Sequence, residues 1–269
     1  MPLLSTSILL ALLAAILSYS ILSDSKMPSL ASIRTANAAF KPSYTPVALF
    51  VGGTSGIGQG IAEAFAKHTK GNVHIVIIGR NRAAADAIIA QFPKPTSPNA
   101  KISHEFVQCD VTQMRTVQTV TDSLLERFPK INFLVMSPGF MSLKGRDETD
   151  EGIDRKLAVH YYARWKFTHD LLPSLTRAKE AGEDAKVLSV LAPGKGGEID
   201  LDDLGLKKGF SVQAAALQAP TYNDLMMQVR SFFFAHIIID LIACARNSPN
   251  KTHPSPLFTP IQGLSVPDY

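Results

Sequence analysis

The 269-residue chain has little of the residue chemistry on which several protein classes depend. Its 2 cysteines, Cys109 and Cys244, lie far apart and form neither a metal-binding nor a disulfide pattern, so a reducing compartment is the simplest interpretation. The 7 histidines are scattered without the spacing of metal ligands, and no metal site is predicted. The formal charge of +4 is not gathered into a block of lysine and arginine, so nothing indicates nucleic-acid binding.

Charged residues are also absent from Pro2–Ser23, a run dominated by leucine, isoleucine and alanine. About 20 helical residues span roughly 30 Å, the thickness of a bilayer's hydrocarbon core. No basic residue precedes the run, as a signal peptide would require, and the nearest basic residues follow it (Lys26, Arg34 and Lys41). We therefore expect residues 1–26 to anchor the protein in a membrane, that of the endoplasmic reticulum, with the remainder facing the cytosol. In the alternative interpretation, Met27 is the start, residues 1–26 are an optional extension and the protein is cytoplasmic.

The strongest local pattern is a strand, a glycine-rich turn and a helix. Val47–Val51 is a short apolar run, and apolar residues then recur at helical spacing from Ile57 to Ala66. Such a turn directs free backbone N–H groups and the positive end of a helix dipole at one point, which suits a pyrophosphate. The alternative is a plain β–α connection. The residues expected to bind are Gly52, Thr54, Ser55, Gly56, Ile57 and Gly58.

The spacing G-x-x-x-G-x-G, ending in Gly-Ile-Gly, resembles the cofactor turn of the short-chain dehydrogenase/reductase family, and the resemblance extends from about Pro46 to Gln228. Glu198–Leu206 resembles an insertion of the retinol-dehydrogenase-like branch. The resemblance implies an α/β fold over residues 27–245, a Rossmann-type doubly wound parallel sheet. Apolar runs predict strands at 47–51, 72–79, 104–108, 131–136 and 185–191, and helices are expected at 83–92, 112–128 and 154–175.

The resemblance implies a nicotinamide cofactor, and the residue after the second strand indicates which one. NAD binders carry an acidic residue there for the ribose hydroxyl, whereas this chain has Arg80 followed by Asn81. A guanidinium suits a 2′-phosphate, so NADP is predicted; a surface arginine with no ligand is the alternative. Asp110 and Val111 resemble the family's Asp-Val pair, whose acidic residue binds the adenine amino group. Gly139 matches the glycine of the Asn-Asn-Ala-Gly turn under the cofactor, but Met136-Ser137-Pro138 replaces the other residues, so that turn needs hydrogen bonds from elsewhere.

The catalytic residues of the family are only partly matched. Tyr222 stands at the place of the catalytic tyrosine, but Met226 replaces the lysine and Ala192 replaces the serine. By strand alternation Ser189 points to the opposite side from position 192, which makes it a poor substitute. The active-site asparagine falls on His160, a titratable side chain that could act as a proton relay. A second Y-x-x-x-K spacing, from Tyr162 to Lys166, lies inside the preceding helix, where the family has no catalytic tyrosine, so we reject it.

The C-terminal part departs from the family. Ser231–Ala245 is strongly apolar but matches no family segment, so we expect the fold to be incomplete there, and residues 246–269 are expected to be disordered. Three hypotheses stay open: an NADP(H)-dependent oxidoreductase acting on an apolar alcohol or carbonyl compound, a nucleotide-binding pseudoenzyme, or a truncated product without independent function. A homodimer is a further expectation.

Overall fold

The computed structural model describes residues 29–96, 102–192, 195–233 and 238–243. The expected membrane anchor and the expected disordered tail lie outside these residues. Within the described ranges no helix is both long enough and apolar enough to cross a bilayer.

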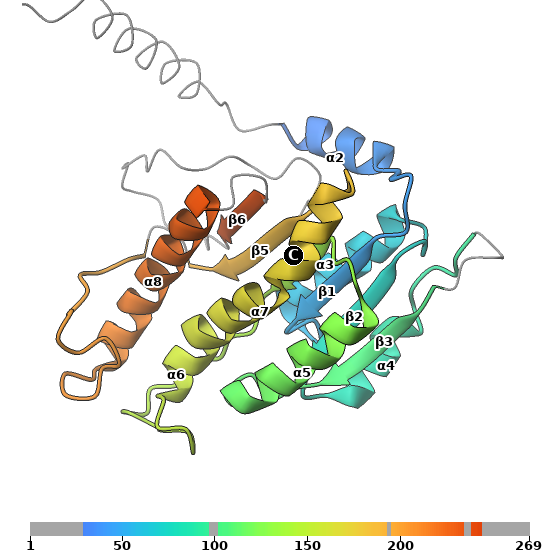
Figure 1. Ribbon diagram of the computed structural model, residues 1–269. Coiled ribbons are helices and arrows are strands. Elements are labelled where there is room, and N and C mark those ends of the chain that lie inside the picture. The colour runs from blue at the N-terminus through green and yellow to red at the C-terminus, as the bar shows by residue number, and fades with distance from the viewer. Residues whose placement is uncertain (1–28, 97–101, 193–194, 234–237, 244–269) are drawn as a thin grey trace, which may run out of the picture.

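A parallel sheet of six strands forms the centre of the molecule, in the order β3-β2-β1-β4-β5-β6 (Figure 1). The strands are β1 (Val47–Val51), β2 (His74–Gly79), β3 (His104–Gln108), β4 (Phe133–Met136), β5 (Lys186–Leu191) and β6 (Ile238–Ala243). The chain moves outward in one direction from β1 to β3 and in the other from β4 to β6, so the strand order reverses between β1 and β4. Val51, the last residue of β1, pairs with Ile78 on one side and Met136 on the other. The predicted Rossmann-type doubly wound fold is confirmed.

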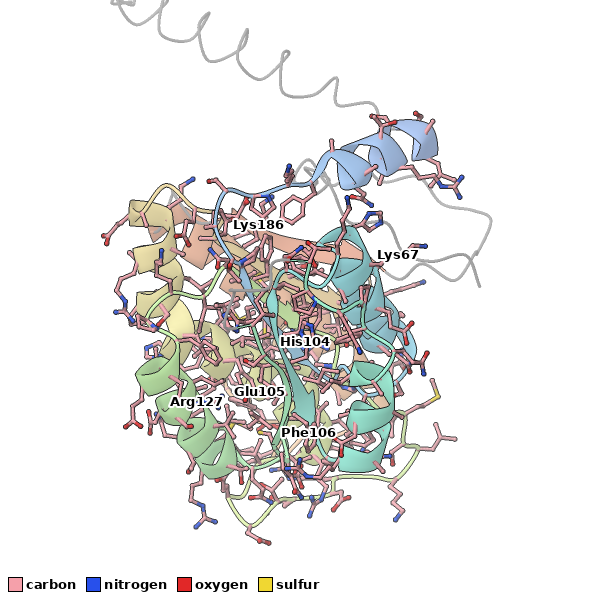
Figure 2. The ribbon with its side chains drawn as sticks, turned by 90° about the vertical axis from the view of Figure 1, so that its right-hand side faces the viewer. Lys67, His104, Glu105, Phe106, Arg127 and Lys186 are labelled. Atoms are coloured by element: carbon pink, nitrogen blue, oxygen red, sulfur yellow. The ribbon has the colours of Figure 1, made fainter. Side chains whose placement is uncertain are left out.

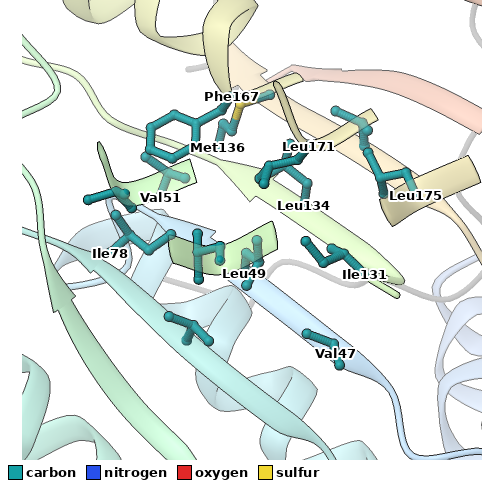
Figure 3. Close-up of a cluster of buried hydrophobic side chains, with 14 of the residues drawn as sticks. Val47, Leu49, Val51, Ile78, Ile131, Leu134, Met136, Phe167, Leu171 and Leu175 are labelled. Atoms are coloured by element: carbon teal, nitrogen blue, oxygen red, sulfur yellow. The ribbon is translucent and has the colours of Figure 1, made fainter. Parts of the chain in front are cut away.

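Helices cover both faces of this sheet, which explains why its strands are continuous apolar runs. α5 (Met114–Arg127) and α7 (Ala163–Glu180) pack on one face, and α3 (Gly56–His68) and α4 (Arg82–Ile89) pack on the other. On the α5–α7 face, Leu49 and Leu134 from the sheet meet Phe167 and Leu171 from α7, all of them buried (Figure 3). Alternate strand residues, such as Phe50, point to the opposite face and pack against α3 and α4.

The edge strand β3 shows the same alternation (Figure 2). Phe106 packs into the core beneath α4, where the Arg82 guanidinium lies 4.9 Å above its ring. Glu105 points to the opposite face and forms an ion pair with Arg127 of α5. Before β1, α2 (Leu30–Ala39) leads to Phe40, whose ring packs 6.0 Å from that of Phe65.

The helix expected over residues 154–175 is longer and is interrupted. α6 (Arg155–Leu157) begins after Asp154, whose carboxylate accepts hydrogen bonds from the first free backbone N–H groups. A π-helical turn, η1 (Ala158–Tyr162), follows, and α7 continues through Pro173 to Glu180. The helix extends past the predicted end at Leu175 to Glu180, because Leu175 and Ala178 are fully buried against the sheet and favour continuation.

Ser231–Ala245, which matches no family segment, contributes to a helix and to a strand. α8 (Val212–Phe233) includes the first residues of that segment, and β6 lies within the remainder. β6 pairs in parallel with β5, from Lys186↔Ile238 to Leu191↔Ala243. An apolar, β-branched run next to an exposed sheet edge gains backbone hydrogen bonds by pairing, and this requires no family motif.

Candidate functional site

A cavity of about 690 Å³ lies at the carboxyl ends of the strands, where the strand order reverses. Open α/β sheets bind ligands at this position because the loops after neighbouring strands diverge there. Its wall comes from the glycine turn after β1 and the residues that directly follow β2, β3, β4 and β5. Val159 and His160 from η1 and Arg164 from the start of α7 complete the lining.

The glycine turn is shaped so that only glycine fits at its key positions. Gly52 has φ +85° and Gly56 has φ +56°, in the left-handed region that favours glycine. A Cβ on Gly52 would lie 2.7 Å from the backbone nitrogen of Pro138, and one on Gly58 would lie 2.1 Å from Ser137 Oγ. A Cβ on Gly56 would meet no atom within 4 Å, so that glycine faces open space.

α3 starts at Gly56 with its free N–H groups at the cavity. Ser55 stands at the N-cap position but its side chain makes no capping hydrogen bond, and no acidic residue lies in the first turn. The N-terminal N–H groups of the helix therefore have no intrahelical or side-chain acceptor in the cap. Together with the helix dipole they make a site for a negatively charged group, and the glycine cradle gives a phosphate room to approach.

The sequence-predicted cofactor residues are brought together with one exception. The glycine-turn residues Gly52, Thr54, Ser55, Gly56, Ile57 and Gly58 line the cavity, as do Arg80, Asp110, Val111 and Gly139. Asn81 is not among the lining residues, because its side chain accepts a 3.0 Å hydrogen bond from Ala84 N and caps α4.

Arg80 and Asp110 line the cavity at the carboxyl ends of β2 and β3. Arg80 follows the last residue of β2, is exposed, and pairs with no carboxylate among the described residues. One carboxylate oxygen of Asp110 accepts hydrogen bonds from the backbone nitrogen (3.0 Å) and hydroxyl (2.9 Å) of Thr112. This local turn fixes the carboxylate at the cavity wall.

His160 also lines the cavity. Its Nε2 accepts a 3.4 Å hydrogen bond from Phe140 N, and the rings of Phe140 and His160 stack with centroids 5.8 Å apart. Burial, followed by the positive charge of Arg164, lowers the pKa of His160 to about 4. The ring is therefore neutral at pH 7, and the expectation that it titrates near neutrality is corrected by its burial.

Arg164 was not predicted from the sequence, although it is a central polar residue of the site. It is 1% exposed, and its guanidinium donates to the carbonyl oxygens of Met136 (3.1 Å) and Pro138 (2.7 Å) and to Ser189 Oγ (2.6 Å). These are the hydrogen bonds that the turn lacks without the family's asparagines. Burial lowers the pKa of Arg164 to about 9, so the side chain stays charged at pH 7. The only sign of its role in the sequence is that the apolar spacing of α7 places this arginine on the buried face of the helix.

Tyr222 lies outside the cavity lining. Its hydroxyl donates to Gln218 Oε1 (2.7 Å) and to the carbonyl oxygen of Leu204 (3.1 Å), within a cluster that includes Leu157 and Tyr161. Burial, with smaller contributions from neighbouring tyrosines and aspartates, raises the pKa of Tyr222. The structure thus places the two predicted catalytic residues apart: His160 lines the cavity and Tyr222 does not.

The positions of the missing serine and lysine also separate. Ala192 lines the cavity, whereas Met226 is buried and does not line it. Ser189 is fully buried and bonds to Arg164, which itself lines the cavity.

The chain is similar in sequence to known proteins of one family. The short chain dehydrogenase family model matches residues 46–196. An oxidoreductase of Emericella nidulans is 34% identical over 238 residues, covering 87% of this chain and 68% of the relative. The oxidoreductase andH of Emericella variicolor is 34% identical over 78% of this chain and 62% of its own length. A human polyprenol dehydrogenase is 27% identical over 67% of this chain and 53% of its own length. The chain thus spans roughly half to two thirds of the length of these curated relatives.

Solved structures share the fold at low identity. An alcohol dehydrogenase from Thermococcus sibiricus, complexed with 5-hydroxy-NADP, superposes with a TM-score of 0.54 at 16% identity, covering 74% of this chain and 76% of that one. A 3-ketoacyl-(acyl-carrier-protein) reductase from Brucella melitensis, complexed with NADH, gives a TM-score of 0.53 at 21% identity, covering 74% and 73%. Both nicotinamide cofactors therefore occur among proteins of this fold.

Proposed function

Because this chain belongs to the short-chain dehydrogenase family, we propose that it is an oxidoreductase that transfers a hydride between NADP(H) and a small apolar alcohol or carbonyl compound. The observation that carries the proposal is the single cavity shared by the glycine turn and His160. The glycine turn offers free helix N–H groups and two positive-φ glycines, which suit a pyrophosphate. The lining also includes a neutral imidazole beside an aromatic ring.

The preference for NADP rests on Arg80. Its guanidinium lies at the cavity directly after β2, where a ribose 2′-substituent is bound in folds of this kind. A planar guanidinium can donate two parallel hydrogen bonds to a phosphate, and its positive charge attracts the phosphate's negative charge. Asp110 and Val111 would lie against the adenine, at the end of β3.

The cofactor, when bound, supplies or accepts the hydride. This chain's residues would hold the organic substrate and handle the proton. Nε2 of His160 accepts from Phe140 N, so in the neutral ring the proton sits on Nδ1. A neutral imidazole can relay a proton to or from a substrate oxygen, and Phe140 beside it gives an apolar contact for the substrate carbon chain.

A second candidate function is cofactor binding without turnover. It is favoured by the hydrogen bonds of the Tyr222 hydroxyl with Gln218 and Leu204, by Ala192 at the serine position and by the buried Met226. A phenol held outside the cavity cannot donate a proton to a substrate inside it. In this case the protein would act as a nucleotide-dependent regulator or scaffold.

One experiment separates these functions. The purified chain is titrated with NADPH and NADH by fluorescence, and then mixed with NADPH and a series of apolar aldehydes and ketones of increasing chain length. Binding together with NADPH oxidation supports the oxidoreductase. Binding without oxidation favours the regulator. Absence of binding to either cofactor contradicts both and leaves the truncated product.

We also propose that residues 3–22 attach the protein to a membrane, because no charge interrupts that run. Full-length protein should sediment with microsomes and resist extraction with alkaline carbonate, whereas a chain starting at Met27 should stay in the supernatant. Release of the full-length chain by carbonate would contradict a spanning segment.

A further inference from the structure

Arg164 joins three segments that are distant in sequence. Through its two terminal nitrogens it contacts the last residue of β4 at Met136 O, the following loop at Pro138 O, and β5 at Ser189 Oγ. Its Nε is buried and forms no hydrogen bond within the described residues. Its partners in the described part of the chain are all neutral and include no carboxylate, although unpaired buried charge is costly. Burying the guanidinium costs stability, but its three hydrogen bonds join segments that a hydrophobic side chain could not hold together.

The loop that Arg164 holds is the packing partner of the glycine turn. Pro138 lies so close to Gly52 that a Cβ on the glycine would approach the Pro138 nitrogen to 2.7 Å. Ser137 donates a 3.4 Å hydrogen bond to the carbonyl oxygen of Gly52, and its Oγ occupies the space next to Gly58. A shift of the 137–139 loop would therefore move the turn that faces the cavity, because no space remains between them.

The contacts of Arg164 also extend to the backbone of His160. The Ser189 hydroxyl lies 3.4 Å from Asn223 Oδ1 of α8, and Asn223 Nδ2 donates a 2.7 Å hydrogen bond to the carbonyl oxygen of His160. That carbonyl is part of the π-helical turn, where the regular helix hydrogen bonds are displaced. One buried network thus connects the glycine-turn wall with the backbone of His160.

We propose that Arg164 is a positioning residue that holds the 137–139 loop against the glycine turn and thereby sets the affinity of the cofactor site. It does so in place of the asparagines that are missing from Met136-Ser137-Pro138. The proposal rests on the proposed function, in that the turn is the binding site for a nicotinamide dinucleotide. Lysine cannot replace it fully, because one ammonium cannot span the carbonyl oxygens of Met136 and Pro138 with the geometry of a guanidinium fork.

The test compares Arg164→Met with Leu175→Ala, a core variant on the same helix whose side chain is fully buried in the hydrophobic cluster of Figure 3 and does not line the cavity. Both variants should lower the melting temperature. Arg164→Met should weaken NADPH binding about tenfold or more, the effect of losing hydrogen bonds to a charged group. Leu175→Ala should leave the dissociation constant within about twofold of the original, the additivity expected for distant sites. Equal dissociation constants for the two variants would overturn the proposal.

A second variant covers the case in which Arg164→Met does not fold. Arg164→Lys keeps the charge and should bind NADPH with an affinity between those of the original and the methionine variant. Ser189→Ala removes the contact to β5 but keeps those to the loop, so its effect on binding should be smaller than that of Arg164→Lys. An Arg164→Lys protein that binds like the original would contradict the proposal.

Amide hydrogen exchange separates this proposal from the proposed function. Arg164→Met or Arg164→Lys should accelerate exchange at the amides of Ser137, which donates to Val51 O, and Phe140, which donates to His160 Nε2, without any cofactor, whereas Leu175→Ala should not. If the unmodified protein binds neither NADPH nor NADH, the proposed function fails, but faster exchange at these amides would still support the positioning role. Unchanged exchange would refute that role whatever the cofactor does.

Discussion

Gly58 and Ser137 are in contact across the switch point of the sheet. A Cβ on Gly58 would lie 2.1 Å from Ser137 Oγ and 2.5 Å from the carbonyl oxygen of Gly52. The first clash can be relieved by turning a hydroxyl, but the second is with backbone. The start of α3, the glycine turn and the loop after β4 therefore form one packed unit, and the cavity depends on all three.

Gly58→Ala should therefore destabilise the protein and weaken cofactor binding. Overpacking of this kind costs about 1–3 kcal/mol, since either α3 or the 137–139 loop must move. The control is Gly145→Ala, where the added methyl group meets no atom within 4 Å. Thermal unfolding and NADPH titration of both variants test the prediction. A Gly58→Ala protein as stable as Gly145→Ala would show that the contact is loose.

Arg80→Ala should remove the preference for NADPH over NADH. A charge-assisted hydrogen bond contributes about 1.5–3 kcal/mol, which corresponds to roughly ten- to a hundredfold in affinity. Arg82→Ala is the matched control, because Arg82 stacks on Phe106 and is not part of the cavity wall. Both cofactors are titrated against the three proteins. Equal affinities for NADPH and NADH in the unmodified chain would contradict the role of Arg80.

The sequence was informative where one short segment determines the structure. The glycine turn and the buried strands follow from local pattern, and β1 and β3 have the predicted bounds. The role of Arg164 could not be predicted, because its partners at Met136, Pro138 and Ser189 are brought together only by the folded sheet. The strand β6 was missed for a related reason: its pairing depends on the open edge of β5 rather than on a motif.

The two predicted catalytic residues show the same limit. The family resemblance that points to Tyr222 gives a position in the chain but not the direction of the side chain, which depends on how α8 packs against Leu157 and Tyr161. The ordinary pKa of histidine suggested a relay that titrates near neutrality, but burial shifts the pKa of His160 well below that range.

The low pKa of His160 predicts how stability depends on pH. Because the folded-state pKa of about 4 lies below the ordinary value of 6.5, folding favours the neutral ring. This contribution is fully present above pH 6.5 and is lost as the pH falls toward 4, by an amount of roughly 3 kcal/mol at most. His160→Asn cannot titrate and should lose less stability over this range. Urea unfolding at pH 7.5, 6, 5 and 4.5 gives the comparison, and parallel curves for the two proteins would contradict the prediction.

Tyr222→Phe should affect stability rather than turnover. The substitution removes hydrogen bonds to Gln218 and Leu204, with a cost of about 1–2 kcal/mol, while the cavity lining is unchanged. Tyr44→Phe deletes a comparable hydroxyl, bonded to Asp184 away from this cavity, and serves as the control. Rates of NADPH oxidation are measured for both. A selective loss of about 10²–10⁴-fold in Tyr222→Phe would instead restore the role predicted from the sequence.

Ala192→Ser and Met226→Lys should differ, although both restore a residue of the family pattern. Ala192 is exposed at the cavity wall, so a serine there should change stability by only about 0.5 kcal/mol and would add a hydrogen-bond donor facing the substrate. Met226 is 5% exposed and away from the cavity lining, so a lysine would bury a charge without a partner and destabilise the protein by about 2–5 kcal/mol. Melting temperatures and NADPH oxidation rates are measured for each variant alone. A stable Met226→Lys protein with increased turnover would require α8 to present that face to the cavity when the cofactor binds, and Tyr222 would then move toward the substrate with it.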